Sequence, residues 1–266
     1  PYVVTIHDLI FKRFPRYYRS VDRKIYNLKF KYAVKNADIT IAISEQTKRD
    51  LIDFYKADPN RIKVVYQSCH GNFRKEYSNE VLHHIKKKFS LPDQFILNVG
   101  TIESRKNLHA VLNAVSIMKN DVPLVVVGRK TKYMNFINIQ LKKMNFDLNK
   151  IMFLHDVSIE ELPSIYQLSS VFVYPSLFEG FGIPIIEALS CGIPVISSID
   201  GCFKEAGGPE SIYIDPNNYE ELADKIDVCL ENESLRQKMK KSGYEYVKKF
   251  DPKIISKDIM NVYQSF

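Results

Sequence analysis

The segment from 174 to 187 holds the residues best suited to chemistry, because two glutamates, Glu179 and Glu187, lie on either side of a glycine-rich loop. An apolar run predicts a strand before the loop, and Pro184 is favoured in the first turn of a helix, where we also expect Glu187. The loop would then lie at the carboxyl edge of a sheet, where open α/β folds bind ligands. Gly180 and Gly182 leave backbone N–H groups accessible, and the helix N-terminus adds a positive field.

The two carboxylates of this segment are expected to face one ligand. An ionised carboxylate accepts hydrogen bonds from a vicinal diol, at roughly 1.5–3 kcal/mol for each charged bond. A nucleotide sugar carries two suitable groups, the ribose diol and the hydroxyls of its hexose. The spacing alone also fits a structural explanation, in which Glu187 favours the helix dipole and the glycines only turn the chain.

The elements that position the loop follow a regular pattern, in which short β-branched runs alternate with longer amphipathic segments. Near-continuous apolar runs are typical of strands buried on both faces. The βαβα order predicts an α/β fold, with parallel, doubly wound sheets that carry helices on both faces. The predicted strands are Val3 to Ile6, Ile39 to Ile43, Ile62 to Val65, Phe95 to Val99, Leu124 to Val127, Ile151 to Phe153, Val171 to Tyr174, Pro194 to Ser197 and Ser211 to Ile214.

Several predicted helices begin at capping signals. Ser44 and Ser158 each precede acidic residues and an apolar face with helical spacing, and Asn107 leads into a similar pattern. Two further helices are predicted at Tyr219 to Leu230 and Glu233 to Phe250.

The composition is that of an ordinary globular chain, with 266 residues, 45% apolar and 26% charged. The net charge of +7 suits an anionic ligand or an anionic membrane surface. The apolar runs are far shorter than the roughly 20 residues that span a bilayer. The four cysteines show no C-x-x-C spacing, so no zinc or redox motif is indicated, and we expect a reduced cytoplasmic setting; they are Cys69, Cys191, Cys202 and Cys229.

The stretch PSLFEGFGIPIIEALSCGIPVISS closely resembles the signature of family 4 of the retaining glycosyltransferases, which have the GT-B fold. The resemblance covers most of the chain, since TIHDLIFKRFP, ADITIAISEQTKRDLI, VGTIESRKN, VVVGR and GCFKEAGG follow in the family's order. It implies a nucleotide-diphosphate sugar, UDP- or GDP-linked, as substrate, with no cofactor and no metal.

By this resemblance, Glu179 would hold the hydroxyls of the transferred sugar and Glu187 the ribose. The backbone amides of Phe181 and Gly182, in the loop that also contains Gly180, would meet the sugar and the diphosphate. These roles make the loop a donor site.

Arg105 and Lys106 resemble the family's basic pair, which neutralises the diphosphate. They follow a predicted strand and the turn at Gly100, just before a helix. A cation there would stabilise the departing nucleoside diphosphate, a task that a metal ion otherwise performs. An exposed helix start is the structural alternative.

His7 follows the first predicted strand, so it should face the cleft, and it resembles the family's active-site histidine near the reacting sugar. A purely structural histidine is the alternative, and Asp8 is interpreted as a local cap. Val157 resembles part of the segment that reads the nucleobase, and Lys130 is a candidate for a phosphate or base contact.

The resemblance also predicts the domain organisation. Residues 1–72 would be the second half of an N-terminal, acceptor-side Rossmann-like domain, and residues 73–93 a linker. Residues 94–250 would form a complete nucleotide-sugar-binding domain, and residues 251–266 a helix that crosses back to the first lobe. Because the chain opens on a strand without an initiator Met, we expect a preceding stretch that supplies a Gly-rich loop and most acceptor contacts.

Two departures from the family pattern affect the linker region and the segment before Glu205. Residues 67–72 read QSCHGN where many members carry Asn-Gly-Val-Asp, so details of the hinge are not implied. Cys202 and Phe203 stand near the place of the usual Leu-Pro, but Glu205 is retained.

The expected activity is transfer of a hexose, with retention of configuration, to a glycan or lipid-linked acceptor in cell-surface polysaccharide biosynthesis. We expect a cytoplasmic protein without nucleic-acid partners, and leave peripheral contact with the inner membrane surface open. A non-catalytic nucleotide-sugar-binding module and a nucleotide-sugar 2-epimerase are the alternatives.

Overall fold

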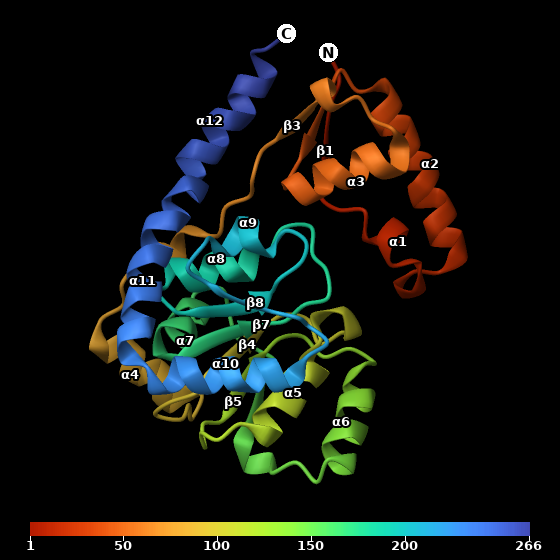
Figure 1. The fold of residues 1–266 in the computed structure, drawn as a ribbon. Helices are drawn as coiled ribbons and strands as arrows, with labels where there is room; N and C mark the ends of the chain where they lie inside the picture. Colours follow the sequence, from red (N-terminus) through yellow and green to blue (C-terminus); the bar gives the residue numbers. More distant parts are fainter.

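The first of two lobes is built on a three-stranded parallel sheet with the strand order β1-β2-β3. A computed structural model describes residues 1–266, and Figure 1 shows this lobe in red and orange. Buried Ile6, Leu9 and Leu51 form the centre of its small core. Its elements are β1 (Val3–Ile6), α1 (Ile10–Arg13), α2 (Ser20–Asn36), β2 (Ile39–Ala42), α3 (Glu45–Tyr55) and β3 (Ile62–Val64).

The second lobe contains a six-stranded sheet, in which all neighbouring strands are parallel. The order β6-β5-β4-β7-β8-β9 places β4 between β5 and β7, so the direction of strand addition reverses there. Such a reversal opens a crevice beyond the carboxyl ends of the two strands at the switch. The strands are β4 (Ile96–Val99), β5 (Leu124–Val127), β6 (Ile151–Leu154), β7 (Val171–Tyr174), β8 (Val195–Ser198) and β9 (Ile212–Ile214).

Helices cover both faces of the second sheet. Alternate strand residues point to opposite sides, so Leu97 and Phe172 belong to one buried cluster, and Ile96 and Val171 belong to another. The first cluster includes residues of α4, α7, α8 and α9, and the second includes residues of α5, α6, α10 and α11. The helices are α4 (Asn79–Lys88), α5 (Leu108–Ile117), α6 (Met134–Lys143), α7 (Leu162–Leu168), α8 (Ile183–Ser190), α9 (Phe203–Gly207), α10 (Tyr219–Glu231) and α11 (Glu233–Val247).

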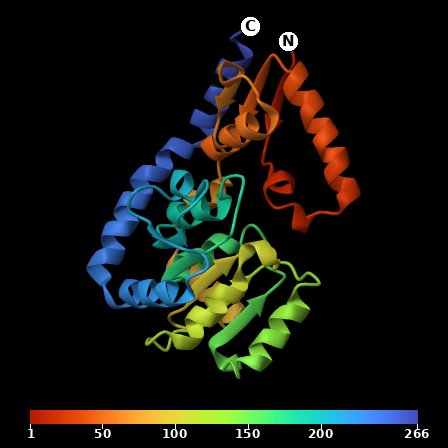
Figure 2. The ribbon, with the colours of Figure 1, turned by 45° about the vertical axis from the view of Figure 1, so that its right-hand side comes forward.

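The last helix, α12 (Pro252–Tyr263), leaves the second lobe and lies beside the first (Figures 1 and 2). Its Ile255 and Val262 are buried against Ile41 and Val65 of the first lobe. The chain therefore crosses between the lobes twice, once after β3 and once before α12. None of the helices combines the length and apolar character needed to cross a membrane.

The predicted α/β fold class is confirmed, and all nine predicted strands are present within one residue of their predicted bounds. The capping prediction at Ser44 is also confirmed, because its side chain accepts a hydrogen bond from the Thr47 N–H. The 17-residue helix α2 was not predicted. No residue of α2 is buried, and apolar Val21 and Leu28 lie exposed among its lysines, so its sequence lacks a clear apolar face.

Candidate active site

Three loops meet where the two lobes face each other. The first follows β4 and carries Arg105 and Lys106, the second follows β7 and carries Glu179, and the third follows β1 and carries His7. A cavity of about 250 Å³ lies between them, lined by His7, Lys106 and Glu179 among others. Two further lining residues of the first lobe are Ile43, which follows β2, and Gln67, which comes after β3. The switch between β4 and β7 thus brings the basic pair and the glutamate together, and the first lobe adds the histidine.

Glu179 is the centre of the site, because both of its carboxylate oxygens are bound. Nη1 of Arg105 lies 2.6 Å from Oε2, and Nζ of Lys106 lies 2.7 Å from Oε1. The hydroxyls of Ser176 and Tyr174 also donate to Oε1, at 2.7 and 3.0 Å. Lys106 donates to the Tyr174 hydroxyl at 2.6 Å, so the five side chains form one connected network.

The charges of this network are matched despite its burial. Burial alone would raise the pKa of Glu179, but Lys106 and Arg105 outweigh it and hold that pKa below its ordinary value. Burial opposes the charge of Arg105 as well, yet the carboxylate of Glu179 raises the pKa of the guanidinium. Burial, with Glu179 beside it, raises the pKa of Tyr174 well above its usual range. Tyr174 is therefore a neutral donor, and Glu179 is an ionised acceptor.

Glycine is required at positions 180 and 182 of the loop for two different structural reasons. A Cβ at Gly180 would lie 2.3 Å from the carbonyl oxygen of His7, so only glycine allows the two lobes to approach this closely. Gly182 has φ of +119° at the N-cap of α8, a backbone conformation that other residues rarely adopt. Phe181 between them is buried and stacks on Tyr66 of the first lobe, with ring centroids 5.4 Å apart.

The predicted position of Glu187 was wrong in one respect. Helix α8 begins at Ile183 and has no acidic residue in its first turn, so Glu187 lies one turn further along. Its Oε2 accepts a hydrogen bond of 3.0 Å from the Tyr166 hydroxyl. Burial raises the pKa of Glu187 to about 7, although the Tyr166 bond lowers it. Glu187 does not line the cavity that Glu179 lines.

His7 and Asp8 both line the cavity from the first lobe. The His7 ring is exposed, with Nδ1 3.4 Å from Nε2 of Gln67. Asp8 acts as the predicted local cap, because its Oδ1 accepts from the Ile10 N–H at 2.9 Å. Burial raises the pKa of Asp8. The first lobe thus presents an imidazole and a carboxylate to the same space.

Three further predicted residues, Gly100, Lys130 and Val157, do not line the cavity. Gly100 follows β4 and has φ of +149°, and a Cβ there would contact the side chain of Lys106 at 3.6 Å. Lys130 is exposed after β5, and Val157 packs partly buried against the core of the second lobe. The structure neither joins these two residues to the cavity nor tests their predicted roles.

Sequence reasoning missed the side chains that orient the two glutamates. Tyr174 and Ser176 bind Glu179, and Tyr166 binds Glu187. Ser176 and Tyr174 had a usable signal, since they lie three and five residues before Glu179 at a strand end. Tyr166 had none, because it belongs to a different helix, and its place follows from packing.

The sequence matches the family Glycosyl transferases group 1 over residues 82–246 and the family Glycosyltransferase Family 4 over residues 1–70. The O-antigen chain mannosyltransferase B of Escherichia coli is 27% identical over 98% of this chain and 70% of that protein. The O-antigen chain mannosyltransferase RfbU of Salmonella typhimurium is 30% identical over 84% of this chain, but the match spans only 62% of that protein.

Solved structures agree with the fold. HepE of Anabaena, in complex with UDP and glucose, has a TM-score of 0.87 with 21% identity, covering 100% of this chain and 72% of that one. A glycosyltransferase of Rickettsia africae has a TM-score of 0.81 with 24% identity, covering 98% and 69%. With a family match over most of the second lobe and a GT-B arrangement of two parallel-sheet lobes, the chain belongs to the family Glycosyl transferases group 1.

Proposed function

We propose that the protein transfers a hexose from a nucleotide-diphosphate sugar to a glycan or lipid-linked acceptor, with retention of configuration, in cell-surface polysaccharide biosynthesis. The observation that carries the proposal is the ion-paired network of Glu179, Arg105 and Lys106 at the switch between β4 and β7, opposite His7. The O-antigen relatives named above support the kind of product, and their names point to mannose as the first sugar to test.

Donor binding would exchange the partners within this network. A diphosphate offers Arg105 and Lys106 stronger anionic partners than one carboxylate, since phosphate oxygens accept bidentate charged hydrogen bonds. Once the cations turn to the diphosphate, the oxygens of Glu179 become free to accept from the sugar hydroxyls. Tyr174 and Ser176 would keep that carboxylate in place during the exchange, because their hydrogen bonds do not depend on the cations.

Retention is proposed through front-face substitution. The bond between the anomeric carbon and the phosphate oxygen breaks as the acceptor oxygen bonds to the same face of that carbon. The proton of the acceptor hydroxyl passes to the departing phosphate, whose negative charge Arg105 and Lys106 stabilise. Glu179 would not serve as a covalent nucleophile, since after the exchange its oxygens would accept from the sugar hydroxyls and from Ser176 and Tyr174.

A thermal-shift panel of UDP-, GDP- and ADP-sugars, with GDP-mannose and UDP-glucose included, tests donor binding. A ligand at a hundredfold excess over its Kd stabilises the native state by about 2.7 kcal/mol, which raises Tm by several degrees. NMR of the anomeric proton in the product then tests retention. A panel in which no nucleotide sugar stabilises the protein, or an inverted product, would contradict the proposal.

The two alternative functions, a non-catalytic binding module and a 2-epimerase, can be distinguished from transfer by the products that form. A non-catalytic binding module would show the thermal shift but release no nucleoside diphosphate in the presence of acceptors. A 2-epimerase would change the sugar of the donor without an acceptor. Cytoplasmic location stays a prediction that rests on the spacing of the four cysteines. Contact with the inner membrane surface also stays a prediction, for which the net charge of +7 is the main support.

A further inference from the structure

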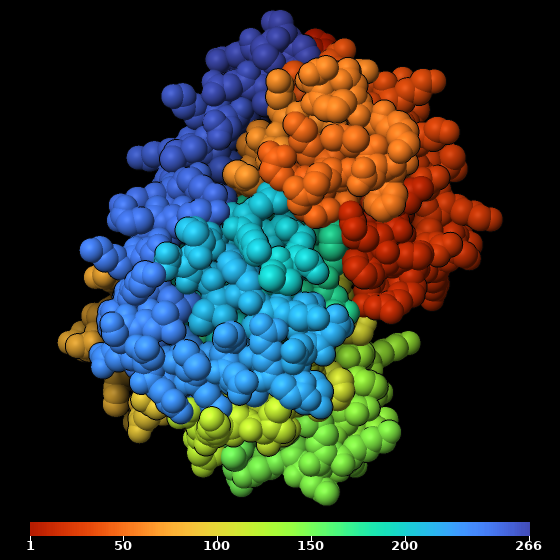
Figure 3. Space-filling view, in the orientation of Figure 1, coloured from red at the N-terminus to blue at the C-terminus, as the bar shows by residue number.

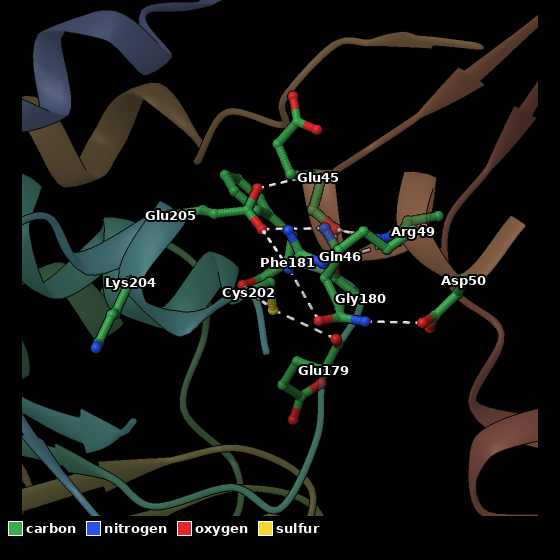
Figure 4. A network of polar contacts seen from close by, with 12 residues as sticks. Glu45, Gln46, Arg49, Asp50, Glu179, Gly180, Phe181, Cys202, Lys204 and Glu205 are labelled. Carbon is green, nitrogen blue, oxygen red and sulfur yellow. Dashed lines mark hydrogen bonds and ion pairs between the residues drawn. The ribbon is translucent and has the colours of Figure 1, made fainter. Parts of the chain in front are cut away.

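Helix α3 of the first lobe has its N-terminus bound by a carboxylate of the second lobe. Oε2 of Glu205 accepts from the Glu45 N–H at 2.7 Å, and Oε1 accepts from the Gln46 N–H at 3.0 Å (Figure 4). The Glu205 side chain is 15% exposed. Arg49 lies further from the carboxylate, at 3.9 Å. The backbone amides, rather than Arg49, are therefore the main partners of Glu205.

Glu205 supplies a hydrogen-bond acceptor that the first two N–H groups of α3 do not find within their own lobe. The first N–H groups of a helix have no acceptor within the helix, and a carboxylate there also interacts favourably with the helix dipole. In a capping box a Glu or Gln at the third helical position helps to cap the same end, but α3 has Thr47 there. Glu45, at the first position, has an exposed side chain. Ser44 accepts only from the Thr47 N–H, so the acceptor for the first two N–H groups of α3 comes from the other lobe.

The same end of α3 contacts the loop that carries Glu179. The Ser44 hydroxyl accepts from the Thr47 N–H at 3.0 Å and donates to the carbonyl of Gly180 at 2.7 Å. The Thr47 hydroxyl donates a hydrogen bond to the carbonyl oxygen of His7 at 3.3 Å. Because Gly180 has no Cβ, the loop that carries Glu179 can pack directly against the same His7 carbonyl. One helix end therefore joins the histidine loop to the glutamate loop.

Glu205 is itself fixed to the glutamate loop through α9. Cys202, the N-cap of α9, donates from Sγ to the carbonyl of Phe181 at 2.7 Å. The Tyr246 hydroxyl donates to the carbonyl of Glu205 at 2.9 Å. Figure 3 shows the surfaces of the orange first lobe and the cyan α9 region in contact. Loop, α9 and α3 form a closed set of contacts across the cleft.

We propose that Glu205 is a positioning residue for transfer, which holds the lobes closed so that His7 and Glu179 line one cavity. Glu205 does not touch that cavity and acts through α3. Loss of its charge should let the lobes separate while leaving Arg105, Lys106 and Glu187 in place. Donor affinity should then change little, and turnover should fall. The kinetic part of this inference rests on the proposed function, whereas the lobe distance does not.

The distance between the lobes is measured by electron–electron double resonance with spin labels. Labels on Val21→Cys and Ile139→Cys suit this, because those positions are 63% and 52% exposed and the native cysteines are buried. In Glu205→Gln the amide can accept only one of the two N–H groups, so we expect a longer and broader distance distribution. Glu45→Ala is the matched control, since it alters an exposed side chain and keeps the N–H. A distribution in Glu205→Gln equal to that of wild type, or equal broadening in the control, overturns the proposal.

Kinetics provide the second measurement. In Glu205→Gln we expect kcat for donor turnover to fall by at least about tenfold with the donor Kd within about twofold, since misplaced groups slow the chemical step. Unchanged kcat in a variant with separated lobes also overturns the proposal. Glu205→Asp, which keeps the charge on a shorter side chain, substitutes for the amide variant if that one fails to fold. If wild type shows no donor turnover, the proposed function fails while the distance measurement still decides the role of Glu205.

Discussion

Nη1 of Arg105 lies 2.6 Å from Oε2 of Glu179, although the two residues belong to loops that follow different strands of the second sheet. The pair is largely buried, with side chains 17% and 12% exposed. Removal of one member leaves the other charge buried without its partner, which is costly. The two charged groups neutralise each other within the site, so the proposed donor would have to offer better partners to both.

Glu179→Ala should lower turnover by at least about two orders of magnitude, because the sugar would lose its carboxylate acceptor. The same change should leave the affinity for a free nucleoside diphosphate equal or higher, since Arg105 and Lys106 no longer compete for Glu179. Calorimetry with UDP and GDP, beside steady-state kinetics, separates the two effects. Glu160→Ala, at an exposed position, is the control. Turnover like that of wild type in Glu179→Ala would remove Glu179 from the site.

Activity should persist in EDTA, because Arg105 and Lys106 are proposed to supply the charge that a metal ion would otherwise provide. Lys106→Ala should reduce kcat by about tenfold or more, and added Mg²⁺ should not restore it. The check is the release of nucleoside diphosphate measured with EDTA and then with Mg²⁺. Strict dependence on a divalent cation in wild type would contradict the role of the basic pair.

The strands could be predicted from sequence because short, β-branched apolar runs are typical of parallel strands that are buried on both faces. Residue types and spacing pointed to Glu179 and Glu187, but the separate roles of the site residues came from the family resemblance, which carries roles and not contacts. The pairing of Arg105 with Glu179 depends on β4 lying next to β7 in the sheet. Neither the segment around Arg105 nor the segment around Glu179 specifies that strand order. The contact between Glu205 and Glu45 joins residues 160 positions apart, so only the placement of the lobes reveals it.

Stability should depend on pH through Glu187, whose pKa is raised by burial from 4.5 to about 7. The folded state then binds the proton more tightly than the unfolded state does. The resulting stabilisation is fully present below about pH 4.5 and is lost as the pH rises through about 7, with a total of about 3 kcal/mol. Urea denaturation at pH 5 and pH 8 measures it.

Glu187→Gln cannot ionise, so its free energy of unfolding should fall less between those two pH values than that of wild type. Other carboxyls with raised pKa, such as Asp8 and Glu205, act in the same direction in both proteins. The difference between wild type and variant therefore isolates Glu187. An identical pH dependence in the two proteins would show that Glu187 is ordinary in the folded state.

Gly180→Ala tests how closely the lobes must approach. The added Cβ would lie 2.3 Å from the His7 carbonyl oxygen, so either the loop or the first lobe must move. We expect a loss of about 1–3 kcal/mol of stability, as for other overpacked sites, and a lower kcat from the displaced Glu179 loop. Gly71→Ala is the matched control, because nothing lies within 4 Å of a Cβ there, and its stability should change by no more than about 0.5 kcal/mol. Urea denaturation and donor turnover of both variants provide the measurement. Equal behaviour of the two alanine variants would mean that the loop and His7 are not held together in solution, and that the closed cleft is not the state in which the protein works.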